Sequence, residues 1–230
     1  MICKETLMKM EKSNILNDVG AIIFDLDGTL VDSMWLWHEI DIEYLAKFGL
    51  SLPEGLQQSI EGMSFYETAV YVKDRFQIPD PLERIMDDWN QMAWDKYENE
   101  VPLKPGVDVF IRECKKRRLK LGIATSNSRE LVENVLSVHG LLDSFDCIMT
   151  GSEVKNGKPA PDIYLAVAEK LGIAPAHCLV FEDIIPGIMA GQNAGMKVCA
   201  VEDVYSSDFR EEKEKLADFF IMDYNELTDV

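Results

Sequence analysis

The chain has 230 residues, of which 47% are hydrophobic and 28% are charged, a composition typical of one large folded domain or of a core with a small insertion. Its 41 acidic residues outnumber the 23 basic ones and give a formal net charge of −18, which argues against nucleic acids and anionic membranes as partners. A small anionic substrate remains compatible with this charge, because one local cation can reverse the sign of the field inside a cleft.

The sequence indicates neither a membrane span nor a secretory signal. No segment has the roughly 20 apolar residues of a span, and residues 1–20 interleave charged and apolar side chains. The five cysteines are widely spaced and form no Cys-X-X-Cys pair, which favours reduced thiols over a zinc site or disulfides. We therefore expect a cytoplasmic protein.

The first expected strand is 21–24, and the segment that follows it is helical. Residues 35–101 contain no convincing strand, and helices are expected at 35–48, 64–76 and 82–97. We interpret this block as an insertion that forms a cap over the strand ends, with 1–34 and 102–230 forming the core. The alternative is that these helices cover one face of the sheet.

From residue 102 onwards, helices and strands alternate. Helices are expected at 105–117, 128–138, 162–171 and 186–194, and strands at 119–124, 145–149, 178–181, 197–201 and 218–222. The strands are mostly continuous apolar runs, which is typical of parallel strands buried on both faces. The predicted fold class is therefore α/β, with a doubly wound, Rossmann-like parallel sheet.

Polar residues follow four of the expected strands. In a doubly wound sheet, ligands bind beyond the carboxyl ends of the strands, so these residues should converge on one cleft. They are Asp25 and Asp27 after the first strand, Thr125, Ser126 and Asn127 after the second, Lys158 after the third, and Glu182 and Asp183 after the fourth.

These residue types suit the transfer of a phosphoryl group. One carboxylate can attack phosphorus, and a second carboxyl two residues on can protonate the leaving oxygen and then activate water. The surplus acids Glu182 and Asp183 suit a hard divalent cation, most plausibly Mg²⁺. Lys158 and the Thr125 hydroxyl would neutralise and orient the phosphoryl oxygens.

Four segments carry a resemblance to a known family. They are FDLDGTLVDS (24–33), IATSNS (123–128), GKPAPDIY (157–164) and VFEDIIPGIMAG (180–191). In this order they resemble the haloacid dehalogenase (HAD) superfamily, in the branch with a helical cap inserted after the first strand, which includes β-phosphoglucomutase and small-molecule phosphatases. The resemblance covers the chain from about residue 19 and implies a HAD core with an inserted α-helical cap.

The resemblance also implies roles for individual residues. Asp25 matches the nucleophile and Asp27 the general acid and base. Asp183 matches the principal metal ligand and Glu182 a second contributor, while Asp25 and the backbone carbonyl of Asp27 also bind the metal in the family. Lys158 and Thr125 match the phosphate-binding lysine and hydroxyl residue.

The function that follows is a Mg²⁺-dependent phosphatase that hydrolyses a small phosphorylated metabolite through an aspartyl-phosphate. A phosphomutase is the first alternative, but Trp37 and Phe65 stand near the positions where β-phosphoglucomutase has a histidine and an arginine, which disfavours a second phosphate. Ile184 replaces a serine that often follows the Glu-Asp pair. A non-enzymatic phospho-receiver domain is disfavoured by the cap and by the nucleophile's place after the first strand. We expect a monomer or a small homo-oligomer.

Several polar and aromatic residues have structural interpretations. Ser126 and Asn127 could cap the helix that begins near Ser128, a role compatible with phosphate binding. Asp32 is interpreted as structural, and the four tryptophans of the insertion as helix-packing residues. The run 211–215 is interpreted as a solvated helix face with i,i+4 ion pairs.

Overall fold

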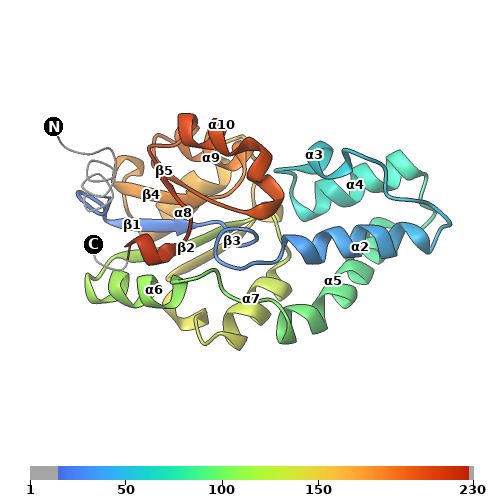
Figure 1. The fold of residues 1–230 in the computed structure, drawn as a ribbon, viewed down its shortest axis with the longest axis horizontal. Helices are drawn as coiled ribbons and strands as arrows, with labels where there is room; N and C mark the ends of the chain where they lie inside the picture. The colour runs from blue at the N-terminus through green and yellow to red at the C-terminus, as the bar shows by residue number, and fades with distance from the viewer. Residues whose placement is uncertain (1–14, 228–230) are drawn as a thin grey trace.

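The computed structural model describes residues 15–227, and it contains a six-stranded parallel sheet in the order β3-β2-β1-β4-β5-β6 (Figure 1). The strands are β1 (Ala21–Phe24), β2 (Lys120–Thr125), β3 (Cys147–Thr150), β4 (Cys178–Glu182), β5 (Lys197–Val201) and β6 (Phe219–Ile221). The predicted α/β fold with a doubly wound parallel sheet is confirmed. The strand order reverses between β1 and β4, which places the expected ligand crevice at the carboxyl ends of these two neighbours.

Helices cover both faces of the sheet and bury its alternating side chains. The helices of the core are α6 (Val107–Lys116), α7 (Arg129–Val138), α8 (Asp162–Leu171), α9 (Ile185–Asn193) and α10 (Arg210–Leu216). Ile22 and Phe24 of β1 point into one hydrophobic core with residues of α6 and α7, and Ala21 and Ile23 into a second with residues of α8 and α9. Burial on both faces explains why the strands are continuous apolar runs.

The predicted helices and strands of the core agree with the structure to within about two residues. The helix predicted at 162–171 is α8, and the strand predicted at 197–201 is β5. Ser128 caps α7 by accepting a hydrogen bond from the backbone N–H of Leu131 at 3.4 Å. The cap therefore belongs to Ser128 rather than to Ser126 or Asn127.

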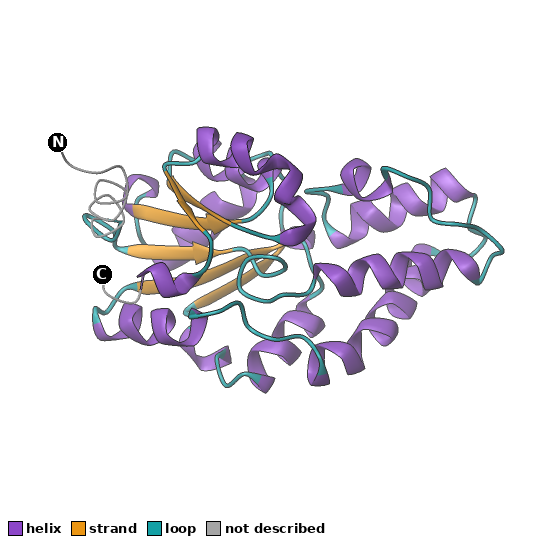
Figure 2. Ribbon diagram, viewed as in Figure 1, coloured by secondary structure: helices purple, strands orange, loops and turns teal. Residues whose placement is uncertain are grey.

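Four helices lie between β1 and α6 in the chain. They are α2 (Met34–Ala46), α3 (Leu56–Ile60), α4 (Phe65–Phe76) and α5 (Leu82–Asn99). Figure 2 shows the strand arrowheads directed toward these helices, which lie beyond the sheet rather than over one of its faces. The sequence did not predict α3, because five residues are too few to display helical periodicity.

The placement of these helices supports a division of the chain into two parts. We propose that 35–101 form a cap and that 1–34 with 102–230 form the core. Residues 1–14 and 228–230 of this division lie outside the described residues.

Of the five cysteines, Cys3 lies outside the described residues. The other four cysteines form no disulfide bond within the described residues. Within 15–227, no helix combines the length and the apolar character needed to cross a membrane.

Candidate active site

Three acidic side chains meet where β1 and β4 end. The strands pair in register Phe24 to Phe181, so Asp25 lies beside Glu182, and its backbone N–H donates to the Phe181 carbonyl at 3.0 Å. One carboxylate oxygen from each of Asp25, Glu182 and Asp183 lies within 4.8 Å of the others. All three residues are buried. The predicted convergence of these acids is therefore present in the structure.

Lys158 reaches the same point from the loop before α8. Its ammonium donates to Asp25 Oδ1 at 2.6 Å and to Glu182 Oε1, and its side chain is only 3% exposed. Burial alone would lower the pKa of Lys158, but the negative charges of Asp25 and Glu182 raise it above its usual value. Lys158 is therefore a fixed positive charge in contact with the candidate nucleophile.

The cluster carries more negative than positive charge. Three carboxylates face one ammonium, which leaves −3 + 1 = −2 when all four groups are ionised. Burial raises the pKa of Asp25 to about 8, with Lys158 opposing this shift and Glu182 adding to it. Burial, with the charges of Glu182 and Asp25, also raises the pKa of Asp183. A divalent cation with a preference for oxygen ligands would balance this charge, so the cluster fits Mg²⁺.

Gly28 allows the turn after β1 to approach Asp183. Its φ is +75°, and a Cβ at this position would lie 2.3 Å from Asp183 Oδ2. The next residue, Thr29, donates its hydroxyl hydrogen to Asp183 Oδ1 at 2.9 Å. The turn thus holds one oxygen of Asp183 in place beside the cluster.

The Asp27 carboxylate is engaged by four donors outside this cluster. Its Oδ1 accepts from Ser33 Oγ at 2.5 Å, from Trp37 Nε1 at 3.3 Å and from the Tyr97 hydroxyl, and its Oδ2 accepts from Asn127 Nδ2 at 2.8 Å. Trp37 belongs to α2 and Tyr97 to α5, so the inserted helices orient this acid. No pattern in the sequence identified Tyr97 as a site residue. Trp37 packs on Phe65 and Tyr97, as predicted for a packing residue, but it also donates to Asp27.

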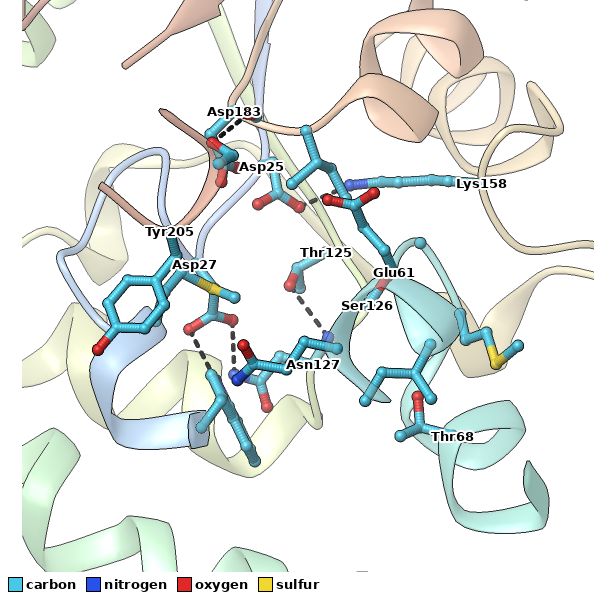
Figure 3. A pocket seen from close by; sticks show the side chains of 18 of the residues that line it. Asp25, Asp27, Glu61, Thr68, Thr125, Ser126, Asn127, Lys158, Asp183 and Tyr205 are labelled. Carbon is cyan, nitrogen blue, oxygen red and sulfur yellow. Dashed lines mark hydrogen bonds and ion pairs between the residues drawn. The ribbon is translucent and has the colours of Figure 1, made fainter. Parts of the chain in front are cut away.

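The residues that end β2 lie on the other side of the cavity from Asp183 (Figure 3). Thr125 Oγ1 accepts from the backbone N–H of Asn127 at 3.0 Å, and the Ser126 carbonyl accepts from the N–H of Phe65 at 2.8 Å. Thr125, Ser126 and Asn127 all line the same cavity as Asp25, Asp27 and Lys158. The structure therefore brings these residues together, while their contacts with a phosphate stay a prediction.

Glu182 is held by four donors from the protein itself. Its Oε1 accepts from Lys158 and from the Tyr164 hydroxyl, and its Oε2 from the backbone N–H groups of Asp183 and Ile184 at 3.0 and 3.4 Å. The side chain is completely buried. This arrangement suits the positioning of Lys158, and direct binding of a metal by Glu182 stays a prediction.

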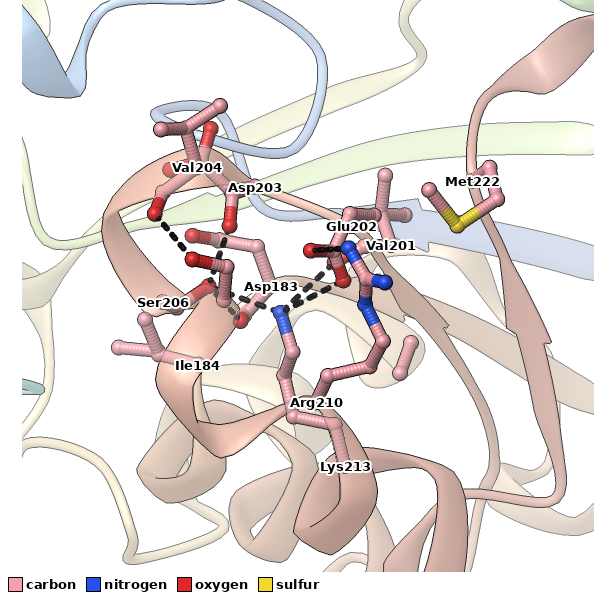
Figure 4. A network of polar contacts seen from close by, with 12 residues as sticks. Asp183, Ile184, Val201, Glu202, Asp203, Val204, Ser206, Arg210, Lys213 and Met222 are labelled. Carbon is pink, nitrogen blue, oxygen red and sulfur yellow. Dashed lines mark hydrogen bonds and ion pairs between the residues drawn. The ribbon is translucent and has the colours of Figure 1, made fainter.

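A buried lysine supports the loop behind Asp183 (Figure 4). Lys213 is fully buried and donates to Ser206 Oγ at 2.8 Å, and Ser206 Oγ in turn donates to the Asp183 carbonyl at 2.9 Å. The interpretation of 211–215 as a solvated face is therefore wrong for Lys213, although Lys215 and Glu211 do form the expected exposed i,i+4 pair. A lysine with an apolar stem can be buried where oxygen acceptors meet its ammonium, and spacing along the helix does not reveal this.

Comparisons with known proteins identify a matching family model and several similar phosphatases and a phosphomutase. The family model described as haloacid dehalogenase-like hydrolase matches residues 22–201. A phosphorylated carbohydrates phosphatase of Thermotoga maritima is 33% identical over 77% of this chain and 82% of its own. A bifunctional riboflavin kinase/FMN phosphatase of Arabidopsis thaliana is 32% identical over 84% of this chain, which spans about half of that relative's length. The crystal structure of β-phosphoglucomutase from Clostridium difficile superimposes with a TM-score of 0.77, at 25% identity, over 91% of this chain and 93% of that one.

Proposed function

Because the chain belongs to the family of haloacid dehalogenase-like hydrolases, we propose that it is a phosphatase that acts on a small phosphate monoester through a phosphoaspartate at Asp25. The observation that carries this proposal is the place of Asp25. It lies at the reversal of strand order, in contact with the ammonium of Lys158 and within 4.8 Å of two further acids. A nucleophilic carboxylate that attacks an anionic phosphoryl group needs such an environment, in which a nearby positive charge offsets the repulsion.

In the first step, an Asp25 oxygen forms a bond to phosphorus while the bond from phosphorus to the ester oxygen breaks. Asp27 donates a proton to that departing oxygen, and the alcohol leaves. In the second step, water attacks phosphorus while Asp27 accepts a proton from it. The bond between phosphorus and Asp25 then breaks, which releases phosphate and restores both carboxyl groups.

Asp25, Asp183 and the backbone carbonyl of Asp27 would hold Mg²⁺, with Glu182 close by. When bound, Mg²⁺ supplies positive charge that offsets the repulsion between the carboxylates and the phosphoryl oxygens. Lys158 and the Thr125 hydroxyl would orient those oxygens. A phosphomutase would need a side chain that binds a second phosphate. Phe65 stands near the position where such a side chain is expected, and it carries no charge, so hydrolysis is the better supported reaction. We propose the cytoplasm as its location.

The test compares two substitutions in the same loop. Asp25→Asn should abolish the release of phosphate from p-nitrophenyl phosphate, because an amide does not attack phosphorus. Asp32→Asn is the matched control: it makes the same change of charge in the same motif, but the exposed Asp32 does not line the cavity. Both variants should melt near the wild-type temperature. If Asp25→Asn retains more than a few per cent of the activity, the nucleophile is misassigned.

A further inference from the structure

Aromatic side chains form much of the wall of the cavity that Asp25 lines. Its lining includes Trp37 of α2, Phe65 of α4, Trp89 of α5, and Tyr205 and Phe209 of the 3-10 segment Val204–Phe209. These side chains come from four separate segments that fold around one space. Aromatic rings bind flat apolar faces well, because such contacts remove a large area from water with little loss of conformational freedom.

Besides the residues already described, the polar side chains that line the cavity include two acids, two amides and the Thr68 hydroxyl. Asp41 and Glu61 are the acids, and Figure 3 shows Glu61 projecting into the cavity. Gln57 and Gln58 of α3 supply two amides, and the Gln57 amide nitrogen is buried without a hydrogen-bond partner in the described part of the chain. These groups can accept from N–H or O–H donors and donate to a carbonyl oxygen.

Positive charge in the cavity is confined to the phosphate end. Among the described residues that line the cavity, Lys158 is the one lysine, arginine or histidine, and it is already paired with Asp25 and Glu182. A carboxylate or a second phosphate on the leaving group would therefore meet Glu61 and Asp41 with no cation to balance it. Such a juxtaposition of like charges disfavours a ligand strongly.

We propose that the substrate is the monophosphate of an uncharged, ring-bearing alcohol whose ring carries both N–H donors and carbonyl acceptors. This inference rests on the proposed phosphatase function and names its substrate class. The ring would lie against the aromatic walls, its donors would face Glu61, and its carbonyl groups would face the Gln57 amide. Leaving groups with a carboxylate or a second phosphate are excluded from this class.

The test uses two substrates of the same shape: 4-carbamoylbenzyl phosphate and 4-carboxybenzyl phosphate. Both release a benzyl alcohol, so they differ chiefly in the charge at the far end of the ring. The kcat/KM for the amide should exceed that for the carboxylate by about tenfold or more. Glu61→Gln should reduce this ratio severalfold. Glu83→Gln, which removes the same charge from an exposed site outside the cavity, should leave the ratio unchanged.

A second pair tests the aromatic walls. The kcat/KM for benzyl phosphate should exceed that for n-propyl phosphate. Phe209→Ala should reduce this ratio, because it removes one aromatic wall of the cavity. The side chain of Phe209 is 38% exposed, so it can be truncated without opening the core. Equal rates for the amide and the carboxylate, or no loss of ratio in Glu61→Gln, would overturn the substrate class while leaving a phosphatase. Absence of Asp25-dependent turnover with every ester would instead overturn the proposed function.

Discussion

Replacement of Lys158 by methionine should destabilise the protein more than any other single change at the active site. Methionine keeps most of the length and the apolar stem, but it removes the ammonium that, among residues 15–227, pairs with both Asp25 and Glu182. The side chains of these two acids are 9% and 0% exposed, so water cannot replace the lost ammonium. Breaking a buried ion pair in this way costs about 3–5 kcal/mol of unfolding free energy.

The loss should depend on pH. Burial already raises the pKa of Asp25 to about 8, and without Lys158, which opposes this shift, the pKa rises further. A carboxyl group whose pKa is higher in the folded state than in the unfolded chain contributes stability at low pH and loses it as the pH rises. Below pH 8 the folded forms of both proteins keep Asp25 largely protonated, so the difference in stability between wild type and Lys158→Met should be nearly constant there. It should grow as the pH rises above 8, where Asp25 ionises in wild type but stays protonated in the variant.

Urea unfolding in EDTA at pH 6 and pH 9.5 measures the effect. The matched control is the double variant Lys158→Met with Glu182→Gln, which removes one of the negative charges left without the ammonium and should recover part of the stability at pH 9.5. Millimolar Mg²⁺ should stabilise Lys158→Met more than wild type, because the variant lacks the ammonium that offsets the negative charge of the three carboxyl groups. A loss below about 1 kcal/mol at pH 9.5, far under the value for a broken buried pair, or an equal loss at both pH values would refute the reasoning.

Four further changes have expected outcomes. EDTA should remove the activity and Mg²⁺ should restore it, while Ca²⁺, with its longer and more flexible coordination, should not; full activity in metal-free enzyme contradicts this. Asp27→Asn should slow alkyl phosphates by about 10²–10⁴-fold, and p-nitrophenyl phosphate less in the first half-reaction, in single-turnover measurements. Tyr97→Phe should lower kcat for alkyl phosphates by more than it changes KM, since it removes one donor to Asp27; an equal effect on p-nitrophenyl phosphate would indicate a general structural role. Burial raises the pKa of Asp41 from 3.8 to about 7, so through this group wild type loses stability as the pH rises from 4 to 7, whereas Asp41→Asn does not. The melting temperature of Asp41→Asn minus that of wild type should therefore increase between pH 4 and pH 7 and stay constant above pH 7.

The sequence predicted that Asp25, Thr125 and Asp183 line one cavity, because topology determines where they lie. Asp25 and Asp183 each follow a buried parallel strand and Thr125 ends another, and parallel strands present their carboxyl ends at one edge of the sheet. Once the strands were recognised from their apolar runs, the meeting of these residues followed. Local sequence was sufficient for this part of the molecule.

The sequence did not predict the other end of the site, because its contacts depend on how the inserted helices pack. Tyr97 lies 70 positions after Asp27, and it follows the other buried residues of α5 at the spacing expected for an ordinary core residue. Lys213 has the spacing of a surface residue on α10, yet it is fully buried beneath the Asp183 loop. Helical periodicity identifies the buried face of a helix but not the residue that this face will meet.

The position of the insertion in the chain links orientation of the proposed acid to binding of the leaving group. Asp27 lies in the short loop between β1 and the first inserted helix, and two of its four donors, Trp37 and Tyr97, come from that insertion. Trp37 also lines the aromatic part of the cavity, where the leaving group of the substrate is expected to lie. A shift of the inserted helices away from the sheet would therefore open the aromatic walls and release two donors from Asp27 together. It follows that Asp27 is fully oriented only when the cavity around the leaving group is formed, which is when a proton is needed at the ester oxygen.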